Sequence, residues 1–203
     1  MEATAVLKID NLSSPLAGPF AFKAPPGHCQ AITGASGSGK SLLLRMIADL
    51  DPNEGAVSLG ELSRAACPAP DWRRRVTYVA AEAGWWADAV AEHFAPATLP
   101  AARALGAQFG LKPELFDGLV LRLSTGEKQR LALIRGLVGA PDALLLDEPT
   151  SSLDEASVRQ VEAVLKARLA AGLILILVTH DPAQAVRLGD RRWEMRQGRL
   201  EPR

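Results

Sequence analysis

The chain has 203 residues, 48% of them hydrophobic, and its 23 lysines and arginines balance 23 aspartates and glutamates. This composition is typical of a folded globular protein and excludes intrinsic disorder and collagen-like or low-complexity structure. A net charge of zero provides no overall field that would attract nucleic acid or an anionic membrane.

Cysteine usage and the N-terminal segment indicate a reducing compartment. Cys29 and Cys67 lack the spacing of a zinc site or a disulfide scaffold, so we interpret both as small apolar residues. The segment MEATAVLKID has no basic region followed by an apolar stretch and predicts no secretion. The longest apolar run, residues 173–178, is shorter than the roughly 20 residues of a membrane-spanning helix. We therefore expect a cytoplasmic protein that does not span a membrane by itself.

The first third of the chain reads as strands and turns with one helix. Alternating or short apolar segments predict strands at residues 5–9, 20–23, 29–33 and 75–79, and DPNEGAVSLGE predicts a turn and a short hairpin strand. After Gly39, a broad apolar face predicts a helix that stops before Asp51-Pro52. Alanine-rich, proline-punctuated segments then predict a small helical insertion at about residues 82–126.

Beyond the insertion, helices alternate with buried strands. We expect helices at residues 124–138 and 155–169, and apolar strands at 143–146 and 173–178. Buried strands separated by helices are typical of parallel βαβ units, in which helices cover both faces of a central sheet. The predicted fold class is α/β with a mostly parallel central sheet, and we expect residues 1–203 to form a single domain.

A glycine-rich segment joins the strand at residues 29–33 to the helix that follows. It matches the P-loop pattern GxxxxGK[ST], and its members are Gly34, Ala35, Ser36, Gly37, Ser38, Gly39, Lys40 and Ser41. The glycines let backbone N–H groups turn inward as an anion nest, and the helix points its positive dipole end at the same place. We expect Lys40 to reach the β- and γ-phosphates of a nucleotide and the Ser41 hydroxyl to bind Mg²⁺. The alternative interpretation is a glycine-rich turn without a ligand.

An acidic pair closes the apolar strand at residues 143–146. The strand would be buried beside the P-loop strand and would deliver Asp147 to the metal, directly or through water. Glu148 would then stand where a base can polarise the water that attacks the γ-phosphate. A solvated strand end is the alternative, but the presence of the P-loop favours catalysis.

The segment LSTGEKQR, residues 123–130, predicts a second helix N-terminus that faces phosphate. Ser124 is a good N-cap, and Gly126 lets the backbone approach a ligand. One helix N-terminus already serves the nucleotide. The second therefore indicates another subunit that closes over it.

With these motifs, the chain resembles the nucleotide-binding subunit of an ATP-binding cassette (ABC) transporter. LSTGEKQR is similar to the family signature LSGGQ, with Thr125 in place of the first glycine and Glu127 in place of the glutamine. Ser152-Leu153-Asp154 matches the family's D-loop, and His180, after LILILVT, matches its switch histidine. The resemblance covers about residues 6–200 and implies the ABC ATPase form of the P-loop NTPase fold, with an N-terminal antiparallel β part.

The resemblance also implies a mechanism and partners. Two copies, or one copy and a related ATPase subunit, would pack head to tail around two ATP molecules. Ser124 and Gly126 would touch the γ-phosphate across the interface, and Asp154 would couple the two sites. Glu148 would be the base, and His180 would hold the γ-phosphate and water. Hydrolysis to ADP and phosphate would drive a separate permease, with the chain on the cytoplasmic face of the inner (plasma) membrane and no nucleic acid partner.

Two departures from the family pattern stand out. Where the family has a glutamine after the strand at residues 76–79, this chain has Ala81, beside Glu82. Where the family has an aromatic side chain that stacks on adenine, this chain has LSSPL at residues 12–16, and we interpret the nearby Phe20 as a core residue. What replaces these two groups is open at the level of sequence.

Aromatic and basic clusters outside the motifs have two interpretations each. Trp85, Trp86 and Phe94 would form part of an interface with the membrane subunits, or would pack within the insertion. The arginines at residues 73–75 and the arginine-rich segment from Arg191 are interpreted as solvated faces, with contact to lipid headgroups or a partner as the alternative.

Three functions remain open. The first is the ATPase of an ABC transporter. The second is a soluble ATP-driven clamp, although this chain shows no sustained heptads and a single cassette. The third, suggested by Ala81, is a nucleotide switch with low turnover. The transported substrate and its direction are not encoded in any motif of this chain.

Overall fold

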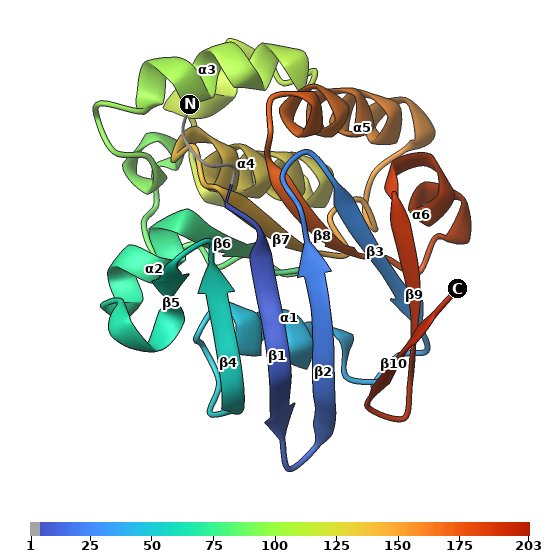
Figure 1. Ribbon diagram of the computed structural model, residues 1–203. Coiled ribbons are helices and arrows are strands. Elements are labelled where there is room, and N and C mark those ends of the chain that lie inside the picture. Colours follow the sequence, from blue (N-terminus) through green and yellow to red (C-terminus); the bar gives the residue numbers. More distant parts are fainter. Residues whose placement is uncertain (1–4) are drawn as a thin grey trace.

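The computed structural model describes residues 5–203, which form two β-sheets and the helices packed on them (Figure 1). The smaller sheet is antiparallel and has the strand order β2-β1-β4-β5. Its strands are β1 Leu7–Ser14, β2 Ala17–Ala24, β4 Glu54–Leu59 and β5 Leu62–Ser63. The antiparallel N-terminal part that the family resemblance implies is therefore confirmed.

The larger sheet contains the buried apolar strands. Its order is β10-β9-β3-β8-β7-β6, parallel except for the antiparallel pair β9–β10. The strands are β3 Cys29–Gly34, β6 Val76–Val79, β7 Ala143–Asp147, β8 Ile174–Val178, β9 Arg191–Arg196 and β10 Arg199–Pro202. β7 and β8 are buried at every position, as expected for parallel strands covered on both faces.

Successive residues of the central strands alternate between two cores. In β7, Leu144 and Leu146 face one core, and Ala143 and Leu145 face the other. The second core lies between the two sheets and includes α1, Lys40–Ile47. The first core lies under the helices on the opposite face (Figure 1), namely α3 Leu99–Gln108, α4 Thr125–Val138, α5 Glu155–Ala170 and α6 Pro182–Leu188. The predicted coverage of both faces is confirmed.

Side-chain caps determine where three of these helices begin. Ser124 and Glu127 form a capping box at the start of α4, because each side chain accepts from the other's backbone N–H. The Asp154 carboxylate accepts from Ser157 N at the start of α5, and Asp181 accepts from Ala183 N before α6. These caps fix the loops that precede α4, α5 and α6.

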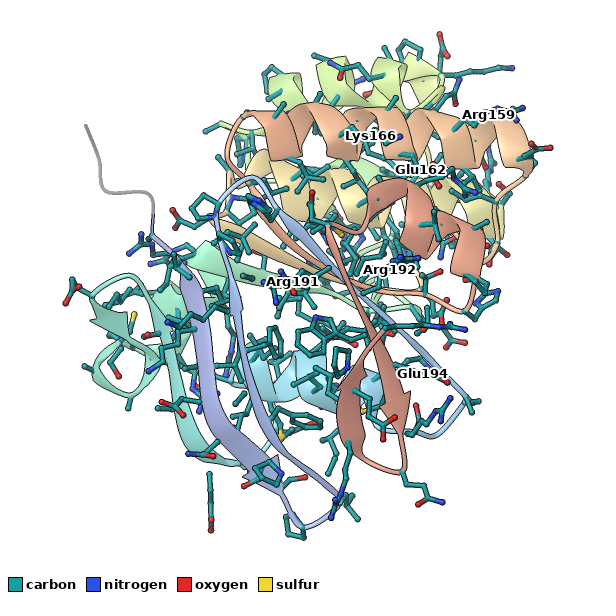
Figure 2. All side chains as sticks on the ribbon, turned by 45° about the vertical axis from the view of Figure 1, so that its right-hand side comes forward. Arg159, Glu162, Lys166, Arg191, Arg192 and Glu194 are labelled. Atoms are coloured by element: carbon teal, nitrogen blue, oxygen red, sulfur yellow. The ribbon has the colours of Figure 1, made fainter. Side chains whose placement is uncertain are left out.

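Helices α5 and α6 are joined by an ion pair whose carboxylate is buried and whose arginine is partly exposed. Glu162 of α5, labelled in Figure 2, accepts from Nη2 of Arg187 at 2.8 Å and from its Nε at 2.9 Å. Gln184 of α6 donates to the same carboxylate at 3.3 Å. Because the buried Glu162 carboxylate is paired and hydrogen-bonded, the two helices form one unit above the sheet.

Several elements differ from the sequence predictions. α2, Ala69–Arg75, and α6 were not predicted, since each has seven residues and too few turns to show a periodic pattern. The segment from Arg191 is the β9–β10 hairpin rather than a solvated face alone, because Trp193 and Met195 alternate with its exposed arginines. Within residues 82–123, all described, α3 is the one α-helix, accompanied by short 3₁₀ turns.

Other predictions for exposed and buried residues are confirmed in part. Cys29 is buried and Cys67 is half-buried, and both are free thiols. Phe20 is a core residue with 1% exposure. In the part of the chain that the structure describes, no helix has the length and apolarity to cross a membrane.

Candidate active site

The P-loop connects the end of β3 to the start of α1. Gly37 and Gly39 have φ angles of 74° and 107°, which side chains rarely tolerate. At Gly34 a Cβ would lie 2.4 Å from Met195 O, so the glycine permits close packing against β9. No side chain among the described residues caps α1. Its first N–H groups are therefore free of side-chain acceptors and can donate hydrogen bonds to an anion bound in the loop.

Two polar side chains in the P-loop point to a ligand. Lys40 is 8% exposed, and its ammonium donates to Gly34 O at 2.8 Å and Ala35 O at 2.9 Å. The buried Ser38 Oγ has no hydrogen-bond partner among the described residues. A buried hydroxyl without a partner is costly, and a bound phosphate oxygen would satisfy it.

The strand β7 delivers Asp147 to the same place. Asp147 is 4% exposed, and its Oδ2 accepts from the Tyr78 hydroxyl of β6 at 3.1 Å. Burial, with the nearby Asp147 charge, raises the pKa of Tyr78 well above its usual range. The phenol therefore stays protonated and remains a donor to the carboxylate.

Glu148 and His180 are in direct contact. Glu148 Oε2 lies 2.6 Å from His180 Nδ1 and accepts from His180 N at 3.0 Å. Glu148 has φ 47°, and its N–H donates to Val178 O at 3.0 Å. The acidic residue after β7 and the histidine after β8 thus come together because β7 and β8 are adjacent parallel strands.

One cavity of about 830 Å³ unites the P-loop with these groups. Its lining includes seven of the eight predicted P-loop residues, together with Asp147, Glu148 and His180; Ala35 is the one that does not line it. The cavity lies at the carboxyl ends of β3 and β7, where ligands bind in open α/β sheets. Its size and lining fit a nucleoside triphosphate.

Besides Ala81 and Leu42, which directly follows the P-loop, three lining residues were not predicted as site residues. Leu16 is 82% exposed at the β1–β2 turn and borders the cavity with Gln197 and Gly198 of the β9–β10 turn. Gly18 N, at the start of β2, donates to Gly198 O at 2.8 Å, and Gly198 N donates to Ser38 O of the P-loop at 3.0 Å, so the β9–β10 turn is bonded to both. A sequence signal existed only for Leu16, which lies in the loop where the family has its adenine-stacking aromatic.

Ala81, the position of the family glutamine, lines the cavity beside Asp147 and Glu148. It also borders a second hollow of about 450 Å³, which Glu82, Trp85 and Gln129 line on the other side. Ala81, with its methyl group, and Glu148 are the two residues that line both hollows.

The signature segment lies outside the P-loop cavity of its own chain. None of the described residues Ser124, Thr125, Gly126, Glu127 and Asp154 belongs to the cavity lining. Ser124 N and Ser124 Oγ each donate to Glu127 Oε2 at 2.8 Å. These bonds, the backbone one foremost, hold the pKa of Glu127 below its usual range. Glu127 is therefore ionised at neutral pH next to the helix N-terminus.

The residues at the cavity fit Mg²⁺ better than a transition metal. Ser41 and Asp147 both line it and offer oxygen donors. Among the described residues no group of three or more His, Cys, Asp or Glu side chains could hold a metal. Mg²⁺ is usually held by one or two protein oxygens, phosphates and waters, which matches this sparse set.

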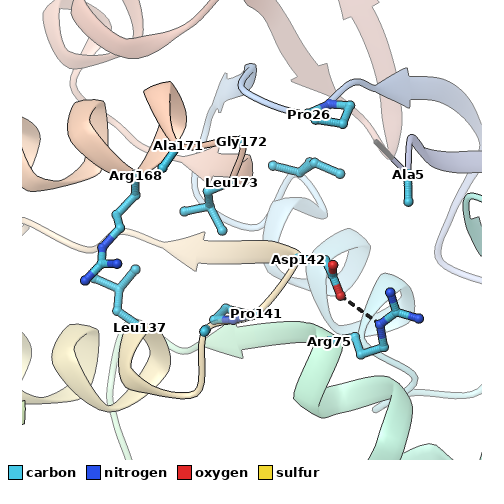
Figure 3. Close-up of a pocket in the computed structure, with 12 residues that line it drawn as sticks. Ala5, Pro26, Arg75, Leu137, Pro141, Asp142, Arg168, Ala171, Gly172 and Leu173 are labelled. Atoms are coloured by element: carbon cyan, nitrogen blue, oxygen red, sulfur yellow. Dashed lines mark hydrogen bonds and ion pairs between the residues drawn. The ribbon is translucent and has the colours of Figure 1, made fainter. Parts of the chain in front are cut away.

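A separate hollow of about 520 Å³ opens at the amino ends of β7 and β8 (Figure 3). Arg75 Nε donates to Asp142 Oδ2 at 2.7 Å there, and Arg168 lies across from them. Because Arg75 is already paired and this edge is opposite the P-loop, we do not assign the nucleotide to it.

The fold and the cavity define a P-loop nucleotide-binding protein. Residues 18–151 match the family model described as ABC transporter. The chain is 34% identical to a Fe(3+) ions import ATP-binding protein of Rhodococcus jostii over 97% of its own length and 61% of the relative. It is 38% identical to a Fe(3+) ions import ATP-binding protein of Pseudomonas fluorescens, over 89% of its own length and 54% of the relative. A Cobalt import ATP-binding protein of Rhodobacter capsulatus is 37% identical, over 89% of this chain and 70% of the relative.

Solved structures share the fold. An ATP binding subunit of an ABC transporter superposes with a TM-score of 0.87 at 23% identity, covering 96% of this chain and 88% of that one. A bacterial Atm1-family ABC exporter with ATP bound superposes with a TM-score of 0.83 at 25% identity, covering 97% of this chain and 38% of that one. The chain belongs to the ABC transporter family, as an ATP-binding ABC ATPase domain. It spans 61% and 54% of the length of these two iron-import relatives.

Proposed function

We propose that this chain hydrolyses ATP to ADP and phosphate as the energising subunit of an ABC importer, in a head-to-tail dimer. The observation that carries the proposal is the single cavity that unites the uncapped P-loop helix, Asp147 and the Glu148–His180 pair. Relatives whose names state import, and an ATP-binding function, support the same assignment.

The phosphates would lie on the P-loop. Lys40 would exchange its two carbonyl partners for the β- and γ-phosphates, and Ser38 Oγ would gain its missing partner. Ser41 and Asp147 would hold Mg²⁺, which would neutralise phosphate charge. Tyr78 would orient the Asp147 carboxylate toward the cavity.

Glu148 would accept a proton from the attacking water. Its Oε2 already bonds His180 through both the ring and the backbone, so the pair is oriented before the nucleotide arrives. His180 is mostly exposed, with 66% of its side chain accessible, and can turn toward the γ-phosphate. A base held in this way needs little reorganisation during the reaction.

The signature would act on the other subunit's nucleotide. Ser124, Thr125, Gly126 and Glu127 lie outside their own chain's cavity, which supports action across an interface. Asp154, whose carboxylate caps α5, would couple the two sites through the loop between Glu148 and α5. The N-terminal dipole of α4 would favour the γ-phosphate, while the ionised Glu127 makes the capping box rigid.

A permease would dock on the segment from residue 82 to 126, which we propose is the inserted subdomain. Trp86, Leu119 and Leu121 are exposed by 69%, 37% and 75%. They lie on adjacent segments, because Val120 N donates to Asp88 O at 2.8 Å. Phe94 and Trp85 instead pack against the core, which leaves Trp86 as the aromatic side chain available to an interface. The chain would then act at the cytoplasmic face of the membrane.

Two measurements test this function. We expect phosphate release from ATP that requires Mg²⁺ and is abolished by a chelator. Co-expression with a permease encoded next to the gene is expected to give a stable complex that Trp86→Ala weakens and the distant, exposed Arg159→Ala leaves intact. ATP hydrolysis without any such complex would support the soluble clamp.

One observation favours a second candidate, the low-turnover switch. Ala81 presents only a methyl group to the cavity, so the proposed Mg²⁺ site lacks the ligand that the family has there. A measured turnover below about 0.01 per second, far under the usual range of enzymes, would support the switch.

A further inference from the structure

Gln129 binds the segment that carries the catalytic base at three points. It lies in α4, just after the signature, and its Nε2 donates to Glu148 O at 2.8 Å and to Ser151 Oγ at 3.2 Å. Its Oε1 accepts from Ser152 N at 3.1 Å. Both donor hydrogens of the amide and one acceptor site are thus used on residues 148–152.

The bond to Glu148 holds a residue in an uncommon conformation. Glu148 has φ 47°, a left-handed value that costs a non-glycine residue energy and persists only where the surroundings hold the residue in place. Its N–H is fixed by Val178 O of β8, and its side chain by His180. Its carbonyl accepts from Ser151 N of the same segment at 3.3 Å and, more closely, from Gln129 Nε2 of α4 at 2.8 Å.

The segment has a second anchor on its other side. Gln184 of α6, 1% exposed, donates to Thr150 Oγ1 at 2.9 Å. The loop after β7 therefore lies between a glutamine of α4 and a glutamine of α6. Loss of Gln129 would leave the Gln184 anchor and the bond from Ser151 N in place, so the loop would remain folded while the Glu148 carbonyl lost its bond to α4.

We propose that Gln129 is a positioning residue that makes the alignment of Glu148 depend on the position of α4. This inference rests on the proposed function, in which the N-terminus of α4 contacts ATP bound to the other subunit. Gln129 lies one helical turn beyond Thr125 and Gly126. A shift of α4 toward that ATP therefore moves the amide that holds Glu148 O. Occupancy of one site is thereby linked to the base in the other.

Variants of Gln129 separate this role from packing. Gln129→Met keeps the length of the side chain, carries no charge and removes all three bonds. Gln129→Glu keeps acceptors for Ser152 N and the Ser151 hydroxyl but loses the donor to Glu148 O. The matched control is Gln108→Glu, the same chemical change at an exposed position of α3.

The experiment measures kcat, KM, the Hill coefficient for ATP and the thermal midpoint. For both Gln129 variants we expect kcat to fall by roughly tenfold to 10²-fold with KM within about threefold, since a small misplacement of a catalytic group has effects of this size. The Hill coefficient is expected to fall toward about 1, because the link between sites is lost. Gln108→Glu is expected to match the wild type.

Three outcomes overturn the proposal. If Gln129→Met retains the wild-type kcat and Hill coefficient, Gln129 does not position the base. If Gln129→Glu alone is slow and its pH profile shifts, the cause is the added charge and not the lost donor. If the wild-type protein hydrolyses no ATP, the proposed function fails, and this inference fails with it.

Discussion

Glu148 Oε2 and His180 Nδ1 lie 2.6 Å apart, although the two residues follow different strands. The contact exists because β7 and β8 are neighbours in register, with Asp147 opposite Val178. A carboxylate oxygen and an imidazole nitrogen at this distance form a short hydrogen bond. This pair is therefore the most direct target for testing hydrolysis.

Glu148→Gln is expected to bind ATP and hydrolyse it slowly. The amide preserves the shape but cannot accept the proton, a role worth roughly 10² to 10⁴ in rate. Phosphate release gives the rate, and size-exclusion chromatography with Mg²⁺ and ATP is expected to show a trapped dimer. A variant that stays monomeric under saturating ATP, with and without the permease, would contradict the head-to-tail dimer.

Lys40→Ala is expected to weaken ATP binding by roughly tenfold to 10²-fold, the range of a hydrogen bond to a charged group. Lys40 is nearly buried, and without nucleotide it is held by Gly34 O and Ala35 O. Titration with a fluorescent ATP analogue measures the affinity. Lys8→Ala, at an exposed lysine of β1, is the control and should bind normally. Equal affinities for the two variants would refute the P-loop assignment.

Ala81→Gln is expected to leave ATP affinity within about threefold, below 1 kcal/mol, while changing the Mg²⁺ dependence of hydrolysis. Ala81 lines the cavity beside Asp147, so a glutamine there would bring an oxygen toward the metal. Mg²⁺ titrations of both proteins make the comparison. An unaltered titration, together with loss of activity in Glu82→Ala, would show that the ligand belongs one residue later.

Asp154→Asn is expected to remove part of the acid sensitivity of folding. Backbone and side-chain bonds from Ser157, helped by the charge of Arg130, hold the pKa of Asp154 below its usual range. The ionised form therefore stabilises the fold above the unfolded pKa of about 4, and this stability is lost as the pH falls through the lower folded value. Denaturant unfolding at several pH values measures it. The gap between wild type and variant should narrow toward pH 3, and a constant gap would disprove the linkage.

Local motifs made much of the site predictable. The P-loop glycines, Lys40 and the apolar strand before Asp147 each carry their information within a few neighbouring residues, so their elements could be predicted correctly. The wall formed by Gln197 and Gly198 could not, because it depends on β9 pairing with β3 from a distant part of the chain. The hydrogen bonds of Gln129 depend in the same way on how α4 packs beside the loop after β7.

The elements β9 and α6 were not predicted, because β9 is too charged and α6 too short to show a clear hydrophobic pattern. In β9 the alternation of Trp193 and Met195 with exposed residues is that of a half-buried strand, but its arginines suggested a solvated surface. α6 starts with Pro182 after the cap Asp181, a clear start signal whose helix is too short for periodicity to support. Short elements of this kind are defined by what they pack on.

The bonds from the β9–β10 turn to Gly18 and Ser38 have a consequence for how the protein is made. During synthesis, β3, the P-loop and α1 leave the ribosome long before Gly198 does, so the P-loop first exists without the turn that holds Ser38 O. Contacts between such distant residues form late in folding, because the intervening chain must first be closed into a loop. A nascent chain should therefore acquire firm nucleotide binding only after β10 has emerged.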